Sequence, residues 1–391
     1  MEIKQVAQFV NIATAEILGT ETPFNEDLTN IVDVGKQLTD IDFKLWIEKF
    51  MGNLINHIGK VVVVNRTYNG SAPSVLMDGW EYGSILEKIH SEMPEAVEND
   101  SWELTNGVSY DPNIYYKPKA YTKFFNKRTT FEIDRSIVDR QIKQSFSSAE
   151  QMNAFISMLF NEVNKSMTVK TDALIMRTIN NFIGATLIDS FPAQNYSDNS
   201  TAKAVNLLKL YNDKFGENVE AENAIYTPEF IRFASHIMGV YMDRMKRMSI
   251  NFNIGGTQKF TPEDKLHFIT LSDFNSAANA YLQSDVYHDQ FTRLPNSETV
   301  AYWQGSGLEY SFGNISEIHN TIIDAEGNTK TVEASGILGC MFDRDALGVT
   351  NIDRRVTTNY NSKAEFTNYF YKADAGYFND YNENFVVFFV A

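Results

Sequence analysis

The feature that most constrains this chain is a long stretch without helix breakers. Residues 119–183 contain no glycine and no proline, so they must form long regular structure. Their first part, 121–133, is rich in aromatic and β-branched residues and predicts a strand. A capping-box pattern at 147–150 and apolar residues at spacings of three and four then predict one helix over 148–187. This helix would be about 60 Å long and would run along an extended subunit.

The segments before this helix lack an apolar partner in their own neighbourhood. Apolar spacing predicts amphipathic helices near the N-terminus and over 42–58, followed by a strand at 60–65. We expect the N-terminal segment to be an arm. Residues 84–120 are highly charged, contain turn signals and predict an extended hairpin with little core of its own. A long polar hairpin is rarely stable alone, so we expect it to lie on another subunit.

From residue 190 onward, helices and strands alternate. Helix start signals occur at Thr227 and Asp273. The last run, 384–390, is apolar on both faces and predicts a covered strand. Together with the earlier elements, this predicts an α+β protein. Further strands are predicted at 267–271, 300–303, 309–312, 316–323 and 329–337.

Composition excludes several classes of protein. The 391 residues include 50 acidic and 34 basic side chains, a net charge of −16, which is unsuited to wrapping nucleic acid. The single cysteine, Cys340, excludes an intramolecular disulfide and a cysteine-based metal cluster. No signal peptide and no apolar run of membrane-spanning length is present. We therefore expect a soluble protein of a reducing compartment, without membrane contact.

Motifs for chemistry are also missing. The six histidines do not have the spacing of a helical metal site, so we interpret each as a surface histidine or a satisfied core histidine. Asp343 and Asp345 alternate as in a calcium loop, but the required glycine and glutamate do not follow. No nucleotide-binding or nucleophile motif occurs. We predict no catalytic, cofactor-binding or metal-binding residues and no cofactor.

One basic cluster stands out in this acidic chain. It has two interpretations: a solvated strand pair, or an intersubunit contact that meets acidic residues of a neighbour. We keep its members as candidate intersubunit contacts: Lys117, Lys119, Lys123, Lys127 and Arg128.

The order of arm, hairpin, long helix, α/β body and closing strands resembles the major capsid proteins of tailed bacteriophages with the Hong Kong 97-type fold. Four runs carry the likeness: GKVVVVNRTYNGSAPSVLMDGWEYGSILEKI, NAFISMLFNEVNKSMTVKTDALIMRTINNFI, LQSDVYHDQFTRLPNSETVAYWQGSG and GILGCMFDRDALGVTNIDRRVTTNYNSKAEFTNYFYKADAGYF. The resemblance implies an N-terminal arm, a strand and E-loop region, a peripheral domain with a spine helix, an axial domain and a C-terminal return to the peripheral domain. These parts would span 1–58, 59–125, 126–194, 195–335 and 336–391.

The resemblance implies a structural, non-enzymatic subunit. Its copies would form hexamers and pentamers of an icosahedral virion capsid around double-stranded DNA, after assembly in the host cytoplasm. A separate scaffolding protein, a portal and minor capsid proteins are possible partners. Two alternatives remain: the shell of an encapsulin-like nanocompartment, and an acidic carbohydrate-active enzyme.

The resemblance also raises the question of covalent cross-links. Some relatives join a lysine of the E-loop to an asparagine of a neighbour, but the accepting asparagine and assisting glutamate cannot be matched here. We therefore expect non-covalent shells. We further expect a mature subunit of full length, loss of normal shells on deletion of residues 1–19, and an apolar stripe on the long helix that includes Leu159 and Val163.

Overall fold

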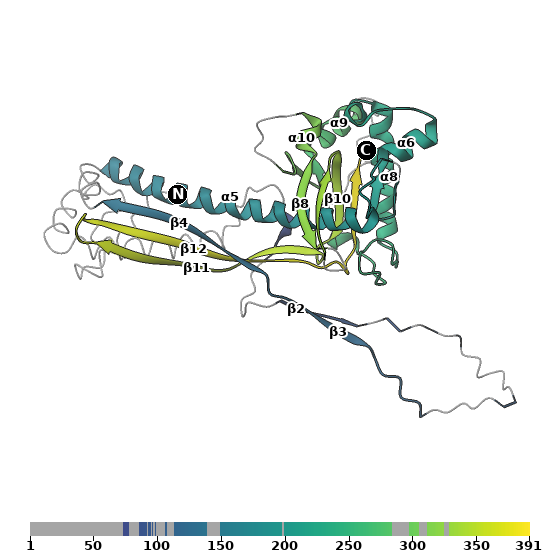
Figure 1. The fold of residues 1–391 in the computed structure, drawn as a ribbon, viewed down its shortest axis with the longest axis horizontal. Helices are drawn as coiled ribbons and strands as arrows, with labels where there is room; N and C mark the ends of the chain where they lie inside the picture. The colour runs from purple at the N-terminus through teal and green to yellow at the C-terminus, as the bar shows by residue number, and fades with distance from the viewer. Residues whose placement is uncertain are drawn as a thin grey trace.

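The computed structural model is an extended subunit with a projecting hairpin (Figure 1). The description covers residues 73–77, 86–91, 93–94, 96, 98, 106–107, 113–138, 149–197, 199–283, 297–304, 311–323 and 328–391. The predicted arm, the helix at 42–58 and the strand at 60–65 lie outside these residues.

A single helix, α5 (Ala149–Ser190), runs along the subunit and confirms the predicted long helix. Its 42 residues correspond to about 63 Å. Its C-terminal half is buried in the body, with Ile175, Ile179 and Phe182 fully inaccessible to solvent. Val163 is also buried, as predicted, whereas the side chain of Leu159 lies outside the described part.

Beneath this helix lies a four-stranded sheet, in the order β1-β11-β12-β4, of which β4, β11 and β12 are long; we call it the long sheet (Figure 1). The β11–β12 and β12–β4 pairs are antiparallel, and β1 is parallel to β11. The sheet uses strands from distant parts of the sequence: β1 (Leu76–Met77), β4 (Arg128–Val138), β11 (Leu347–Asn361) and β12 (Phe366–Asn379).

A second, five-stranded sheet forms the centre of the body, in the order β5-β13-β10-β6-β7. Strand β13 is buried on both faces, as predicted for the closing run. Phe385, Val387 and Phe389 pack with the C-terminal half of α5, while Val386 and Phe388 pack with the cluster around α6 and α8. The strands are β5 (Ala204–Asn206), β6 (Leu266–Leu271), β7 (Ser297–Val300), β10 (Ile337–Asp343) and β13 (Phe385–Phe389).

The remaining elements surround these layers. The helices are α6 (Leu207–Phe215), α7 (Ala221–Ala224), α8 (Pro228–Met245), α9 (Ser272–Gln283) and α10 (Phe312–Ile315), with short 3-10 helices at Pro73–Val75 and Glu263–Lys265. Two antiparallel strand pairs complete the described fold: β2 (Leu86–Ser91) with β3 (Ala120–Phe125), and β8 (Ile318–Ile323) with β9 (Thr329–Ala334).

Some sequence predictions need correction. The strand predicted over 121–133 is two strands, because β3 belongs to the hairpin and β4 joins the long sheet. The strand predicted at 300–303 ends at Val300. The strand predicted at 309–312 is wrong for Ser311 and Phe312, because the hydroxyl oxygen of Ser311 caps helix α10, which begins at Phe312.

The domain scheme stays a prediction, although the sheets bear on its last segment. That segment, 336–391, supplies β10 and β13 to the five-stranded sheet and β11 and β12 to the long one. It therefore enters both layers of the subunit rather than the long sheet alone.

Candidate assembly interface

The hairpin is held by strands β2 and β3, which we call the hairpin base. Their register pairs Leu86 with Phe125 and His90 with Tyr121. Along β2, exposure alternates: Lys88 and His90 are half-buried, whereas Glu87 and Ile89 are exposed. Because side chains alternate between the faces of a strand, Lys88 and His90 share the inner face of the base with Leu86 and bring cationic and polar groups to it. An inner face of this kind requires acidic partners.

The partners come from residues 380–384 between β12 and β13, which we call the acidic turn. The Asp380 side chain is fully buried. Lys123 Nζ donates to Asp380 Oδ1 at 2.9 Å, and Lys88 Nζ lies 3.5 Å from Asp380 Oδ2. Burial acts to raise the pKa of the Asp380 carboxyl, but the hydrogen bond from Lys123 and the two lysine charges outweigh it and lower the pKa. Asp380 therefore remains ionised between two cations of the hairpin base.

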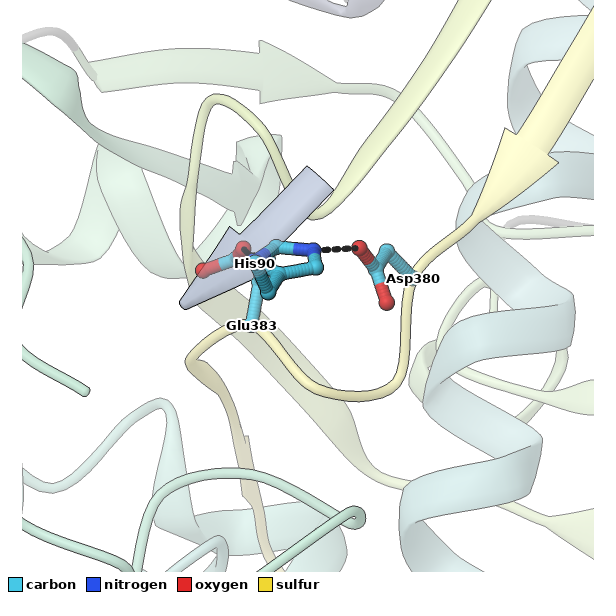
Figure 2. Close-up of side chains that lie close together, drawn as sticks. All are labelled: His90, Asp380 and Glu383. Carbon is cyan, nitrogen blue, oxygen red and sulfur yellow. Dashed lines mark ion pairs between the residues drawn. The ribbon is translucent and has the colours of Figure 1, made fainter. Parts of the chain in front are cut away.

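His90 lies between both acidic residues of the turn (Figure 2). Its Nε2 is 3.5 Å from Asp380 Oδ2, and its Nδ1 is 4.0 Å from Glu383 Oε1. Lys259 Nζ approaches the Nδ1 side, 3.2 Å from Nδ1 and 2.9 Å from Glu383 Oε1. The imidazole thus lies between the two carboxylates of the turn, within 4.0 Å of both.

The ligand atoms of His90, Asp380 and Glu383 lie within 4.8 Å of one another, close enough to consider a metal ion. The geometry argues against one, because the two carboxylates face opposite nitrogens of the ring. The ammonium groups of Lys123 and Lys259 also lie against the two carboxylates. We therefore interpret the group as an ionic cluster within the subunit.

Aromatic contacts strengthen the attachment of the base. Phe125 packs against Phe378 of β12, with ring centroids 5.3 Å apart. The Lys88 ammonium lies 4.6 Å from the centroid of the Phe378 ring and donates to the backbone carbonyl of Asp345. The base is consequently fixed to the body by charge, hydrogen bonds and one aromatic contact.

The outer face of the hairpin has the opposite character. Ile89 is 70% exposed and Phe124 is 63% exposed. Farther along the return strand, Tyr115 and Tyr116 are 81% and 80% exposed. Large apolar side chains gathered on one projecting element mark a surface for another molecule.

The structure separates the members of the predicted basic cluster. Lys117 and Lys119 are exposed in the extended segment before β3, and Lys127 follows β3, where its carbonyl accepts a hydrogen bond from the Tyr377 amide at 3.1 Å. Arg128 begins β4. The pKa of Asp374 is lowered chiefly by the hydrogen bond from Arg355, and the charge of Arg128 acts in the same direction. Lys123 alone of the five joins the ionic cluster, and its acidic partner belongs to its own chain.

Sequence reasoning missed the other members of the cluster. The alternation in β2 gave no clear signal, because Leu86 falls in phase with Lys88 and His90, whereas the polar Glu87 and Ser91 fall in phase with Ile89. Asp380 and Glu383 also stand at the start of the last apolar run. Nothing local indicated that these two segments meet, since His90 and Asp380 are 290 positions apart in the sequence.

Comparison with known proteins identifies the family. A family model for Phi29-like phage major capsid proteins matches residues 10–389. A search of curated proteins found no match. No helix among the described residues combines the length and hydropathy needed to span a bilayer.

Solved phage capsids show a distant likeness. The capsid of Staphylococcus phage Andhra has 10% identity over 81% of this chain and 83% of that chain, with a TM-score of 0.48. The capsid of the Cyanophage P-SCSP1u has 11% identity over 81% of this chain and 86% of that chain, with a TM-score of 0.43. These values are too low to carry an argument. The family model, in contrast, spans nearly the whole chain, which therefore belongs to the Phi29-like phage major capsid proteins and is a structural subunit of a capsid shell.

Proposed function

We propose that copies of this subunit assemble as hexamers and pentamers into a closed icosahedral shell around double-stranded DNA. In this shell, the hairpin of each subunit lies on a neighbouring subunit. The observation that carries the proposal is the apolar outer face of the hairpin, above all Ile89 and Phe124. In a single subunit these side chains remain in water, at a cost of about 25 cal/mol per Å² of apolar surface. Contact with a second copy removes that cost.

The charge of the chain fits this container role. A net charge of −16 limits attraction between the protein and packaged phosphate, so the genome is not held by a basic lining. The family match favours this function over an encapsulin-like nanocompartment and over an acidic carbohydrate-active enzyme. We propose no catalytic role and assign no cofactor.

Electron microscopy of the purified protein tests the shell. Closed shells support the proposal, and exclusively small particles contradict it. The matched test of the hairpin is Phe124→Lys, which places a charge on the apolar outer face and should leave free capsomers or subunits. Its control is Ser166→Lys at an exposed position of α5, which adds the same charge without removing apolar surface. Normal shells from Phe124→Lys would refute the role of the hairpin.

We also propose that the shell is held by non-covalent contacts, with scaffolding, portal and minor capsid proteins supplied as separate chains and assembly in the host cytoplasm. The absence of a matched lysine, asparagine and glutamate set in the sequence supports the first point. Denaturing electrophoresis of assembled particles should give a subunit band near 44.5 kDa. A ladder of multimers would show covalent cross-links instead.

A further inference from the structure

The ionic cluster at the hairpin base contains one histidine, His90, whose ring lies between Asp380, Glu383 and Lys259. We propose that protonation of His90 loosens the hairpin base from the body of the subunit, so that mild acid frees the hairpin to change its direction. The consequence for a shell rests on the proposed function, but the loosening itself is a property of the single subunit.

The hydrogen bond from Lys259 fixes the state of the ring. A lysine ammonium group can only donate, so the contact of 3.2 Å between Lys259 Nζ and His90 Nδ1 requires a lone pair on Nδ1. The neutral ring then carries its proton on Nε2, which faces Asp380 (Figure 2). Protonation would add an N–H group at Nδ1 that points toward the ammonium group of Lys259. The contact would change from a hydrogen bond to a repulsion between two cations.

The surroundings of the ring do not absorb another positive charge. Three ammonium groups already face two carboxylates across the cluster. The side chain of His90 is only 12% exposed, which limits screening by water. The groups around the ring come from its own strand, from β3, from the segment before the 3-10 helix at Glu263–Lys265, and from the acidic turn: Lys88, Tyr121, Lys123, Lys259, Asp380 and Glu383.

Two acidic residues nearby must be kept apart from His90 in any test. The pKa of Asp380 is lowered, despite its burial, by Lys123 and Lys88, so this carboxylate stays ionised in mild acid. The pKa of Asp343 is raised, chiefly by burial, with the charge of Glu383 acting in the same direction. Protonation of Asp343 is therefore easier than that of an ordinary aspartate, and the variants below separate the two groups.

Hydrogen–deuterium exchange of the full-length chain measures the loosening directly. The observable is the exchange of amides in 86–91 and 120–125, corrected for the intrinsic effect of pH. In the wild type, the corrected exchange rate of these amides should be higher at about pH 5.5 than at about pH 7.5. Histidine side chains change charge between these two pH values. We expect an increase of about fivefold or more, as is usual for coupled equilibria.

Three variants identify the sensor. His90→Gln keeps a side-chain oxygen that can accept from Lys259 but cannot titrate, so its exchange should not rise in acid. Lys259→Gln removes the cation that a protonated His90 would meet and should also flatten the response. His319→Gln is the matched control, because His319 is an exposed histidine of β8 beside Glu333 and should leave the response intact.

Each contrary result has a definite meaning. A wild-type hairpin base that opens equally at both pH values, or that tightens in acid, overturns the proposal. A full acid response in His90→Gln that disappears in Asp343→Asn assigns the effect to Asp343 and also overturns it. Electron microscopy of the same samples reads the proposed function separately, because shells can form normally whether or not the hairpin base responds to pH.

Discussion

Strand β13 in the body carries buried apolar side chains on both faces, whereas strand β2 of the hairpin turns Lys88 and His90 toward the body and leaves the large apolar side chain of Ile89 exposed. In the body, the fold of one chain is enough to remove Phe385 and Phe388 from water. In the hairpin, Ile89 remains exposed while Lys88 and His90 meet acidic partners. The body is therefore built for stability within one subunit, and the hairpin is built for attachment at its root and contact at its outer face.

The largest effect is expected where α5 enters the body. Phe182 is fully buried, stacks on Phe385 with ring centroids 4.0 Å apart and lies edge-on to Tyr381. Phe182→Ala should lower the free energy of unfolding by about 3–5 kcal/mol, through lost burial and a cavity. Urea unfolding of the purified subunit at fixed concentration measures it. Val169→Ala, on an exposed part of the same helix, should change stability by no more than about 0.5 kcal/mol; equal losses would contradict the burial of this half of α5.

The next effect concerns the backbone of the body. Gly336, between β9 and β10, has a φ of +78°, and an added Cβ would lie 2.0 Å from the carbonyl oxygen of Val390. Gly336→Ala should therefore cost at least about 2 kcal/mol in thermal or urea unfolding. Gly239→Ala is the control, because Gly239 lies within helix α8 with open space around it and should stabilise by about 0.5–1 kcal/mol. A loss at both positions would mean that the clash at Gly336 is not the cause.

A smaller effect is expected at the attachment of the hairpin. Asp380→Asn leaves Lys88 and Lys123 beside a neutral group and should destabilise the subunit by about 1–3 kcal/mol at neutral pH. The folded-state pKa of Asp380 is lowered, so its contribution is present above the unfolded carboxyl pKa of about 3.9 and is lost as pH falls through the folded value. Measured in a His90→Gln background, which removes the neighbouring imidazole, the difference caused by Asp380→Asn should therefore stay constant from about pH 8 to pH 5 and shrink below about pH 4. A difference that grows on acidification would contradict the assigned ionisation.

The two regions also differ in how far sequence could predict them. The long helix followed from the lack of glycine and proline, and the buried closing strand from its continuous apolar run, because both signals are local. The break between β3 and β4 did not follow, because Asn126 was a single turn-favouring residue between aromatic and β-branched runs that both favour a strand. The two strands separate because their pairing partners lie in different sheets, which is a tertiary effect.

The ionic cluster shows the limit more sharply. Predicting that His90 meets Asp380 and Glu383 would require choosing two acids from 50 in the chain. The start of α10 was different, because Ser311 is a good helix cap and its hydroxyl oxygen accepts from the Asn314 amide. The aromatic residues nearby favour a strand, but the cap at Ser311 begins a helix at Phe312.

The smallest effect on stability is expected on the outer face of the hairpin, and it decides the comparison. Ile89→Ser removes an apolar side chain that is 70% exposed in the single subunit. The free energy of unfolding should therefore change by no more than about 0.5 kcal/mol. If neighbouring copies cover this face, the same change should raise the protein concentration needed for shell formation, because the burial it removes exists only between subunits. Sedimentation of a concentration series measures assembly, and urea unfolding measures the subunit. Phe182→Ala should show the reverse pattern. It should lower the free energy of unfolding of the single subunit strongly, because the contacts it removes lie within one subunit. A subunit strongly destabilised by Ile89→Ser would place this residue in the folding core, and an unchanged assembly threshold would leave the apolar outer face without a role in the shell.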